Sequence, residues 1–215
     1  MKALKAILQL LFPEYCAVCK RAGSSICLEC LSQEPPPECP RDEWIFSLHD
    51  YRRRTVRTAI HRLKYENRRG TSGVFAEALY GAILEELSEL SLLENFSDPI
   101  LAPVPISKAR RKERGYNQSE LISRDLERIS NGFIKNGWGA LEKTRETEHQ
   151  ARIYHRAERM ANVTETFAAK NAEMIRGRNL VLVDDVTTTG ATLAEARKIL
   201  LAAGARRVIA FTVAH

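Results

Sequence analysis

Hydrophobic residues follow two different spacings along the chain, and the changes between them predict alternating strands and helices. Short apolar runs predict strands at residues 44–48, 100–105, 180–183 and 208–213. Apolar residues at three- and four-residue steps predict helices at residues 56–63, 72–93, 121–129 and 192–203. Strands that alternate with helices are typical of an α/β fold, in which a parallel sheet is flanked by helices.

The region before this pattern is dominated by cysteines. Each of two Cys-x-x-Cys pairs lets both sulfurs face one ion, which predicts a structural zinc site formed by Cys16, Cys19, Cys27 and Cys30. The alternative is four unligated thiols in a loop, and Cys39 is expected to be a spare thiol. Residues 31–43 are rich in proline and glutamate, as in a stiff linker. We therefore expect a zinc module with its linker at residues 1–43 and the α/β domain at residues 44–215, with a core of its own that is separate from the cysteines.

The first residues have an amphipathic pattern, with one apolar face of a short helix formed by Leu4, Ile7, Leu8 and Leu11. This apolar run is too short to span a membrane, and no small-residue cleavage site of a signal peptide follows it. We therefore expect a cytoplasmic protein without a membrane span. The short helix would allow contact with the inner face of the membrane or with a partner.

Charge bears on the choice of ligand. The chain has 215 residues and a net charge of +6 at pH 7. This excess suits a polyanionic ligand, either a phosphate compound or a nucleic acid, but it also fits an ordinary solvated surface. A basic run before the helix expected at residues 121–129 is interpreted as a polyanion-binding surface rather than only a charged helix entrance. Its candidates for nucleic-acid binding are Arg110, Arg111, Lys112 and Arg114.

The residues that suggest chemistry follow the apolar run at 180–183. Asp184 and Asp185 end this run, and a turn follows that contains Thr187, Thr188, Thr189, Gly190 and Thr192. Ligands of parallel sheets bind at the carboxyl ends of strands, where the N–H groups of a helix N-terminus bind phosphate. Carboxylates repel phosphate but accept hydrogen bonds from sugar hydroxyls, so the pattern predicts a ribose 5-phosphate ligand. The alternative is an ordinary strand-to-helix turn in which these side chains are only caps.

This signature resembles that of the type I phosphoribosyltransferases, and a larger part of the chain resembles the ComF family, named for its link to natural competence. The similar segments are Leu11-Phe12-Pro13, the two cysteine pairs, Leu63-Lys64-Tyr65, Pro103-Val104-Pro105, Arg114-Gly115-Tyr116-Asn117-Gln118, Arg145 with Gln150, Asn162-Val163 before Phe167, and the acidic–threonine turn. One departure is Asp42, where relatives often have another cysteine.

The resemblance implies a type I phosphoribosyltransferase-like fold and the ligand phosphoribosyl pyrophosphate (PRPP). Asp184 and Asp185 would hold the ribose hydroxyls, and residues 187–192 would surround the 5-phosphate. The pyrophosphate, carried with Mg²⁺, would lie beside Val104, Pro105, Ile106 and Ser107. Residues 143–160 would form a mobile loop in which Arg145, Arg152, Arg156 and Arg159 could neutralise the leaving pyrophosphate. The catalytic candidates are Asp184, Asp185 and Arg145.

Two functional hypotheses follow. The first is a PRPP-binding, phosphoribosyltransferase-like protein that acts in DNA uptake during natural competence or in nucleotide metabolism. Its candidate reaction is phosphoribosyl transfer with release of pyrophosphate. The alternative is a non-catalytic competence factor that binds single-stranded DNA, works with the competence machinery, and uses PRPP as a regulatory ligand or not at all. No nucleobase-reading residue stands out in the sequence, so neither hypothesis names an acceptor.

Overall fold

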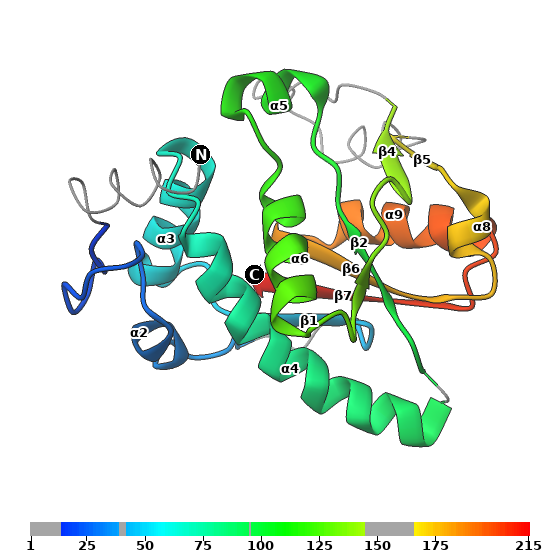
Figure 1. Cartoon of the computed structure of the whole chain (residues 1–215), viewed down its shortest axis with the longest axis horizontal. Helices are drawn as coiled ribbons and strands as arrows, with labels where there is room; N and C mark the ends of the chain where they lie inside the picture. The colour runs from blue at the N-terminus through cyan, green and yellow to red at the C-terminus, as the bar shows by residue number, and fades with distance from the viewer. Residues whose placement is uncertain (1–13, 39–41, 95, 145–165) are drawn as a thin grey trace.

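A computed structural model describes residues 14–38, 42–94, 96–144 and 166–215 (Figure 1). Its centre is a five-stranded sheet in which every neighbouring pair of strands is parallel. In order across the sheet, the strands are β1 (Ile45–His49), β7 (Arg207–Ala214), β6 (Asn179–Val186), β2 (Ile100–Pro103) and β3 (Lys135–Asn136). The α/β fold expected from the sequence, a parallel sheet flanked by helices, is confirmed.

The two faces of the sheet pack into separate hydrophobic cores. On β6, Val181 and Val183 belong to one core and Leu180 and Leu182 to the other, because successive side chains of a strand point to opposite faces. The helices that contribute to the first core are α2 (Leu28–Ser32), α3 (Arg54–Tyr65), α4 (Thr71–Glu94) and α6 (Gln118–Ile129). Those that contribute to the second are α8 (Ala172–Ile175) and α9 (Ala191–Ala202). A separate antiparallel pair, β4 (Leu141–Lys143) and β5 (Phe167–Ala169), lies beside α9.

The end of β6 differs from the expectation. The apolar run predicted a strand at residues 180–183, but the strand continues through both acids to Val186. Asp184 pairs with Thr212 and Val186 with Ala214 of β7. Backbone pairing does not depend on the polarity of the side chain, so the strand outlasts the hydrophobic pattern that revealed it.

The cysteine-containing segment packs directly on the main domain. Cys16, Ile26, Cys30 and Leu31 are all buried, and they belong to the same hydrophobic core as α3 and α4. The expectation that the α/β domain has a core of its own, separate from the cysteines, was therefore wrong. The proline-rich composition predicted a linker, but it did not reveal that the residues before and after this segment share one core.

Several expectations concern residues outside the described ranges. These are the helix at residues 4–11, the thiol of Cys39, and nearly all of the loop at residues 143–160, including Arg145. They stay predictions. Within the described part of the chain, no helix is long and apolar enough to cross a membrane.

Candidate functional site

The carboxyl end of β6 extends beyond the end of its neighbour β2. Pro103, the last residue of β2, lies opposite Val183, whereas β6 continues along β7 with Asp184 and Asp185. The two acids therefore lie at the carboxyl edge of the sheet, where the chain leaves β2. This is the location at which parallel α/β sheets bind ligands.

Asp185 forms a buried ion pair with Lys64, which lies in the last turn of α3. The distance between Lys64 Nζ and Asp185 Oδ2 is 2.7 Å, and Asp185 is only 5% exposed. Burial alone would lower the pKa of Lys64, but attraction to Asp185 and Asp184 outweighs burial and raises it. Lys64 is therefore positively charged and compensates one of the two carboxylates.

Asp184 is held through one of its two carboxylate oxygens. Ser119 Oγ on α6 donates to Asp184 Oδ1 at 2.9 Å, and the backbone N–H of Asp185 donates to the same oxygen, also at 2.9 Å. Burial and the adjacent Asp185 raise the pKa of Asp184 to about 7, although Lys64 and Ser119 oppose the shift. Asp184 is thus a hydrogen-bond acceptor whose protonation changes near neutral pH, a property that is common in functional sites.

The turn after β6 leads into the N-terminus of α9. Gly190 begins this helix with a φ of 74°, and a Cβ at this position would lie 3.3 Å from Ile45 Cδ1. Backbone conformation and close packing on β1 therefore both favour glycine. Thr187 is buried and its N–H donates to Ala214 O at 3.0 Å. The exposed hydroxyl residues near the helix N-terminus are Thr188, Thr189 and Thr192.

The chain that leaves β2 is fixed beside the acids by two hydrogen bonds. Val104 N donates to Val183 O at 3.0 Å, and Asn117 Nδ2 donates to Val104 O at 2.9 Å. The rest of the expected pyrophosphate loop follows directly, as Pro105, Ile106 and Ser107. Ser107 begins α5 (Lys108–Arg114) as its N-cap.

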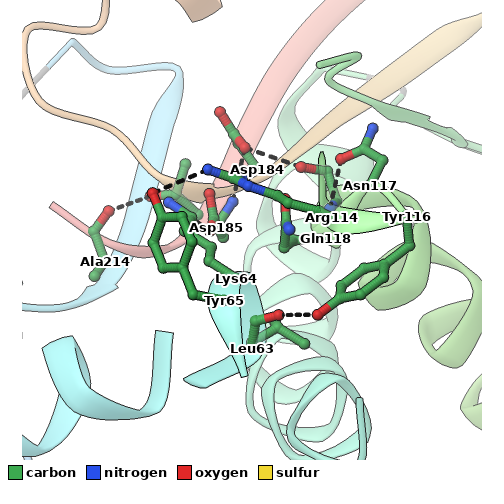
Figure 2. Close-up of polar contacts among 12 residues, drawn as sticks. Leu63, Lys64, Tyr65, Arg114, Tyr116, Asn117, Gln118, Asp184, Asp185 and Ala214 are labelled. Atoms are coloured by element: carbon green, nitrogen blue, oxygen red, sulfur yellow. Dashed lines mark hydrogen bonds and ion pairs between the residues drawn. The ribbon is translucent and has the colours of Figure 1, made fainter. Parts of the chain in front are cut away.

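Two of the four basic candidates on α5 already have partners within the protein. Arg111 Nη1 donates to Glu120 Oε2 at 3.0 Å. Arg114 donates to Gln118 Oε1 at 3.0 Å and to the Tyr65 hydroxyl at 3.1 Å, and it therefore links α5 to the end of α3 near the acids (Figure 2). Of the other two candidates, Lys112 is exposed and Arg110 is partly buried. The polyanion-binding surface expected from the sequence stays a prediction.

The four cysteine sulfurs expected to bind zinc lie together. All four Sγ atoms are within 4.8 Å of one another, and those of Cys19 and Cys27 are 3.6 Å apart. Sulfurs bound at about 2.3 Å around a tetrahedral zinc are about 3.8 Å apart, so the cluster fits such an ion. Within the described ranges it is the only group of three or more histidine, cysteine or acidic side chains that could hold a metal.

Lys64 and Ser119 were not expected at the site from the sequence. Lys64 lies four residues after Ile60 and eight after Val56, on the apolar face of α3. A charged residue on such a face indicates a buried partner, and this signal could have identified Lys64. For Ser119 we find no comparable signal, because its role depends on how α6 crosses the end of β6.

Comparisons with known proteins show the family to which the chain belongs. A family model described as the phosphoribosyl transferase domain matches residues 130–215. The DNA utilization protein YhgH of Escherichia coli K12 is 30% identical over 213 residues, which cover 90% of this chain and 86% of that protein. Competence protein F of Haemophilus influenzae is 30% identical over 206 residues, which cover 92% of this chain and 82% of that protein. The chain belongs to the ComF family.

A third ComF relative matches a smaller part of the chain. Competence protein ComFC of Bacillus subtilis is 36% identical over 116 residues, which cover 53% of this chain and 43% of that protein. The phosphoribosyl transferase match includes the unit β6–α9–β7 with both acids, whereas α3 and Lys64 lie before it. The candidate site therefore combines the matched domain with a preceding part of the chain.

Proposed function

We propose that this ComF protein binds PRPP at the carboxyl edge of β6. The observation that carries the proposal is the combination, at the end of one parallel strand, of two acids and a hydroxyl-rich helix N-terminus. The ribose hydroxyls would donate hydrogen bonds to the acids. The 5-phosphate would accept hydrogen bonds from the first N–H groups of α9 and from Thr188, Thr189 and Thr192.

The pyrophosphate would lie beside Val104, Pro105, Ile106 and Ser107, where Mg²⁺ would enter with the ligand's own phosphate oxygens. Lys143 of β4 is available on this side. Burial and the nearby Arg110 lower its pKa, whereas Glu195 and Asp184 favour its charged form. We propose that Arg110 and Lys143 bind the pyrophosphate and that Arg145 joins them.

The reaction proposed for this site is displacement of pyrophosphate from the anomeric carbon. The bond from this carbon to the pyrophosphate oxygen breaks while a nucleophile of the acceptor forms a new bond, and pyrophosphate leaves with the electron pair. The acids would fix the sugar in position, and the cations would stabilise the charge that develops on the leaving group.

Titration calorimetry with PRPP and Mg²⁺ should give a one-to-one complex, because the sequence contains one acidic–threonine turn of this kind. Pyrophosphate release across a panel of nucleobases and amine acceptors then separates a transferase from a PRPP-binding regulator. A folded protein that binds no PRPP would contradict the proposal. Binding without release for every acceptor would favour the non-catalytic alternative.

We also propose a cellular role in DNA uptake. It is supported by family membership and by the names of the relatives, which refer to competence and DNA utilization. In this role the cysteine cluster is proposed to hold one structural zinc. A closed tetrathiolate site would stabilise the fold rather than supply chemistry.

Single-stranded DNA is the second candidate ligand, favoured by the basic surface of α5. Binding should be weak, and its affinity should fall as salt rises, because each phosphate contact releases counterions. Each contact adds about 0.7 to the steepness of the fall in log affinity with log salt concentration. The double variant Arg110→Ala, Lys112→Ala should reduce the salt slope by about 1.4 if both side chains contact phosphates. Lys198→Ala, on an exposed position of α9, is the control. No binding at low salt, or equal slopes for the double variant and the control, would count against DNA binding by α5.

A further inference from the structure

Two adjacent carboxylates are unfavourable neighbours for a polyanionic ligand. PRPP carries several negative charges, and each uncompensated charge about 12 Å away costs roughly tenfold in affinity at an effective dielectric constant of about 20. If Asp184 and Asp185 both faced the ligand as bare carboxylates, they would oppose the phosphate groups that α9 attracts. A built-in positive charge would remove half of this penalty.

The last turn of α3 supplies such a charge in a fixed position. The Tyr116 hydroxyl donates to the carbonyl of Leu63, and Arg114 donates to the Tyr65 hydroxyl, so both neighbours of Lys64 are held by the end of α5 and the residues just after it (Figure 2). The Lys64 side chain is only 20% exposed, so water and salt screen its charge poorly. The position of Lys64 is thus determined from both sides.

The two acids differ in what they can offer a ligand. Asp185 Oδ2 is occupied by Lys64 Nζ at 2.7 Å. Both hydrogen bonds that the described residues donate to the Asp184 side chain end on Oδ1. Its Oδ2 is therefore available to a ligand. The adjacent acids are therefore in different states before any ligand arrives.

We propose that Lys64 is the internal counter-ion of Asp185, a positioning residue that holds this carboxylate in a neutral ion pair and leaves Asp184 to accept the ribose hydroxyls. The inference rests on the proposed PRPP site. It assigns different roles to two acids that the signature treats alike. The competing possibility is that Lys64 leaves Asp185 and binds a phosphate of the ligand directly.

Titration with PRPP and Mg²⁺ of four full-length proteins separates these possibilities. They are wild type, Lys64→Met, Lys64→Met with Asp185→Asn, and the surface control Lys198→Met. Lys64→Met should weaken binding roughly tenfold or more, because Asp185 becomes an unpaired charge. Adding Asp185→Asn should recover most of the lost affinity, because it restores a neutral pair. Lys198→Met, which loses the same charge from an exposed position, should match wild type.

The pH profile provides a readout that a merely structural role would not change. The charged groups that face Asp184 are Asp185 on its own strand, Lys64 on α3 and Lys143 on β4. Because Asp184 must be unprotonated to accept both hydroxyl bonds, wild-type affinity should fall as pH drops through about 7. Without Lys64 the carboxylate binds its proton more tightly, so the fall should begin at a higher pH in Lys64→Met.

Three outcomes would overturn this role. One is unchanged PRPP affinity in Lys64→Met. Another is a double variant that is folded by circular dichroism yet binds PRPP no better than Lys64→Met, as expected if Lys64 contacts phosphate directly. The double variant also decides the matter if Lys64→Met alone fails to fold. The third is a wild-type protein that binds no PRPP, which would remove the proposed function together with the inference, whereas the first two leave PRPP binding intact.

Discussion

Replacing Asp184 and Asp185 by asparagine should weaken PRPP binding by two to four orders of magnitude. The variant would lose two hydrogen bonds from the ribose to charged groups, and each contributes about 1.5–3 kcal/mol. Each 1.4 kcal/mol corresponds to about tenfold in affinity. Asparagine has nearly the same shape, so the loss would reflect charge and hydrogen bonding rather than packing. Calorimetric titration of the wild type and the variant measures the difference.

An opposing effect makes this test discriminating. Two fewer negative charges beside an anion site would strengthen phosphate binding, and asparagine replaces aspartate well as a cap. Unchanged or tighter binding by a folded variant would therefore show that the acids are only caps, and it would remove the ribose assignment.

The single variant Asp184→Asn is the matched control for folding. Asp185 is buried with Lys64, and removing one partner of a buried ion pair destabilises a protein by about 3–5 kcal/mol. Asp184→Asn leaves this pair intact. It should retain the wild-type circular dichroism spectrum and still lose about ten- to hundredfold in PRPP affinity for each ribose hydrogen bond that Asp184 accepts.

The fold could be predicted from sequence where hydrophobic periodicity follows burial. β6 is buried on both faces, so its apolar residues form an unbroken run that predicts a parallel strand. The helix α4 was recognisable because Phe75, Leu79 and Ile83 recur on one buried face. The hydrophobic pattern did not predict the end of β6, where the strand continues through Asp184 and Asp185, because pairing with β7 uses backbone groups and does not depend on the side chains.

The candidate site was predictable only in its local part. The acids, the threonines and Gly190 are contiguous, so their chemistry could be interpreted from one segment. Lys64 and Ser119 reach the acids from α3 and α6, and their roles depend on how distant helices pack. The same limit explains the error about the core, since Cys16 and Leu31 carry no sign in the sequence that they pack with α3 and α4.

The shared core gives the second large prediction. Cys16→Ser with Cys19→Ser should abolish the binding of one zinc per chain and should destabilise the entire protein. Structural zinc binding contributes about 10–16 kcal/mol in isolated zinc-finger peptides. If loss of zinc lowers the free energy of unfolding of the whole protein by about 4 kcal/mol, the melting temperature should fall by about 8–16 °C, at about 2–4 °C per kcal/mol.

Metal analysis of protein purified without added zinc, together with thermal unfolding followed by circular dichroism, measures both effects. Cys39→Ser is the matched control, because it removes a cysteine that the sequence predicts to be a spare thiol, and it should keep both the zinc and the melting temperature. Full zinc content in the double variant would refute the ligand assignment. Loss of zinc with an unchanged melting temperature would mean that the α/β domain is stable without the module. Because Cys16 and Leu31 are completely buried against the main domain, we expect instead one unfolding transition, shifted as a whole.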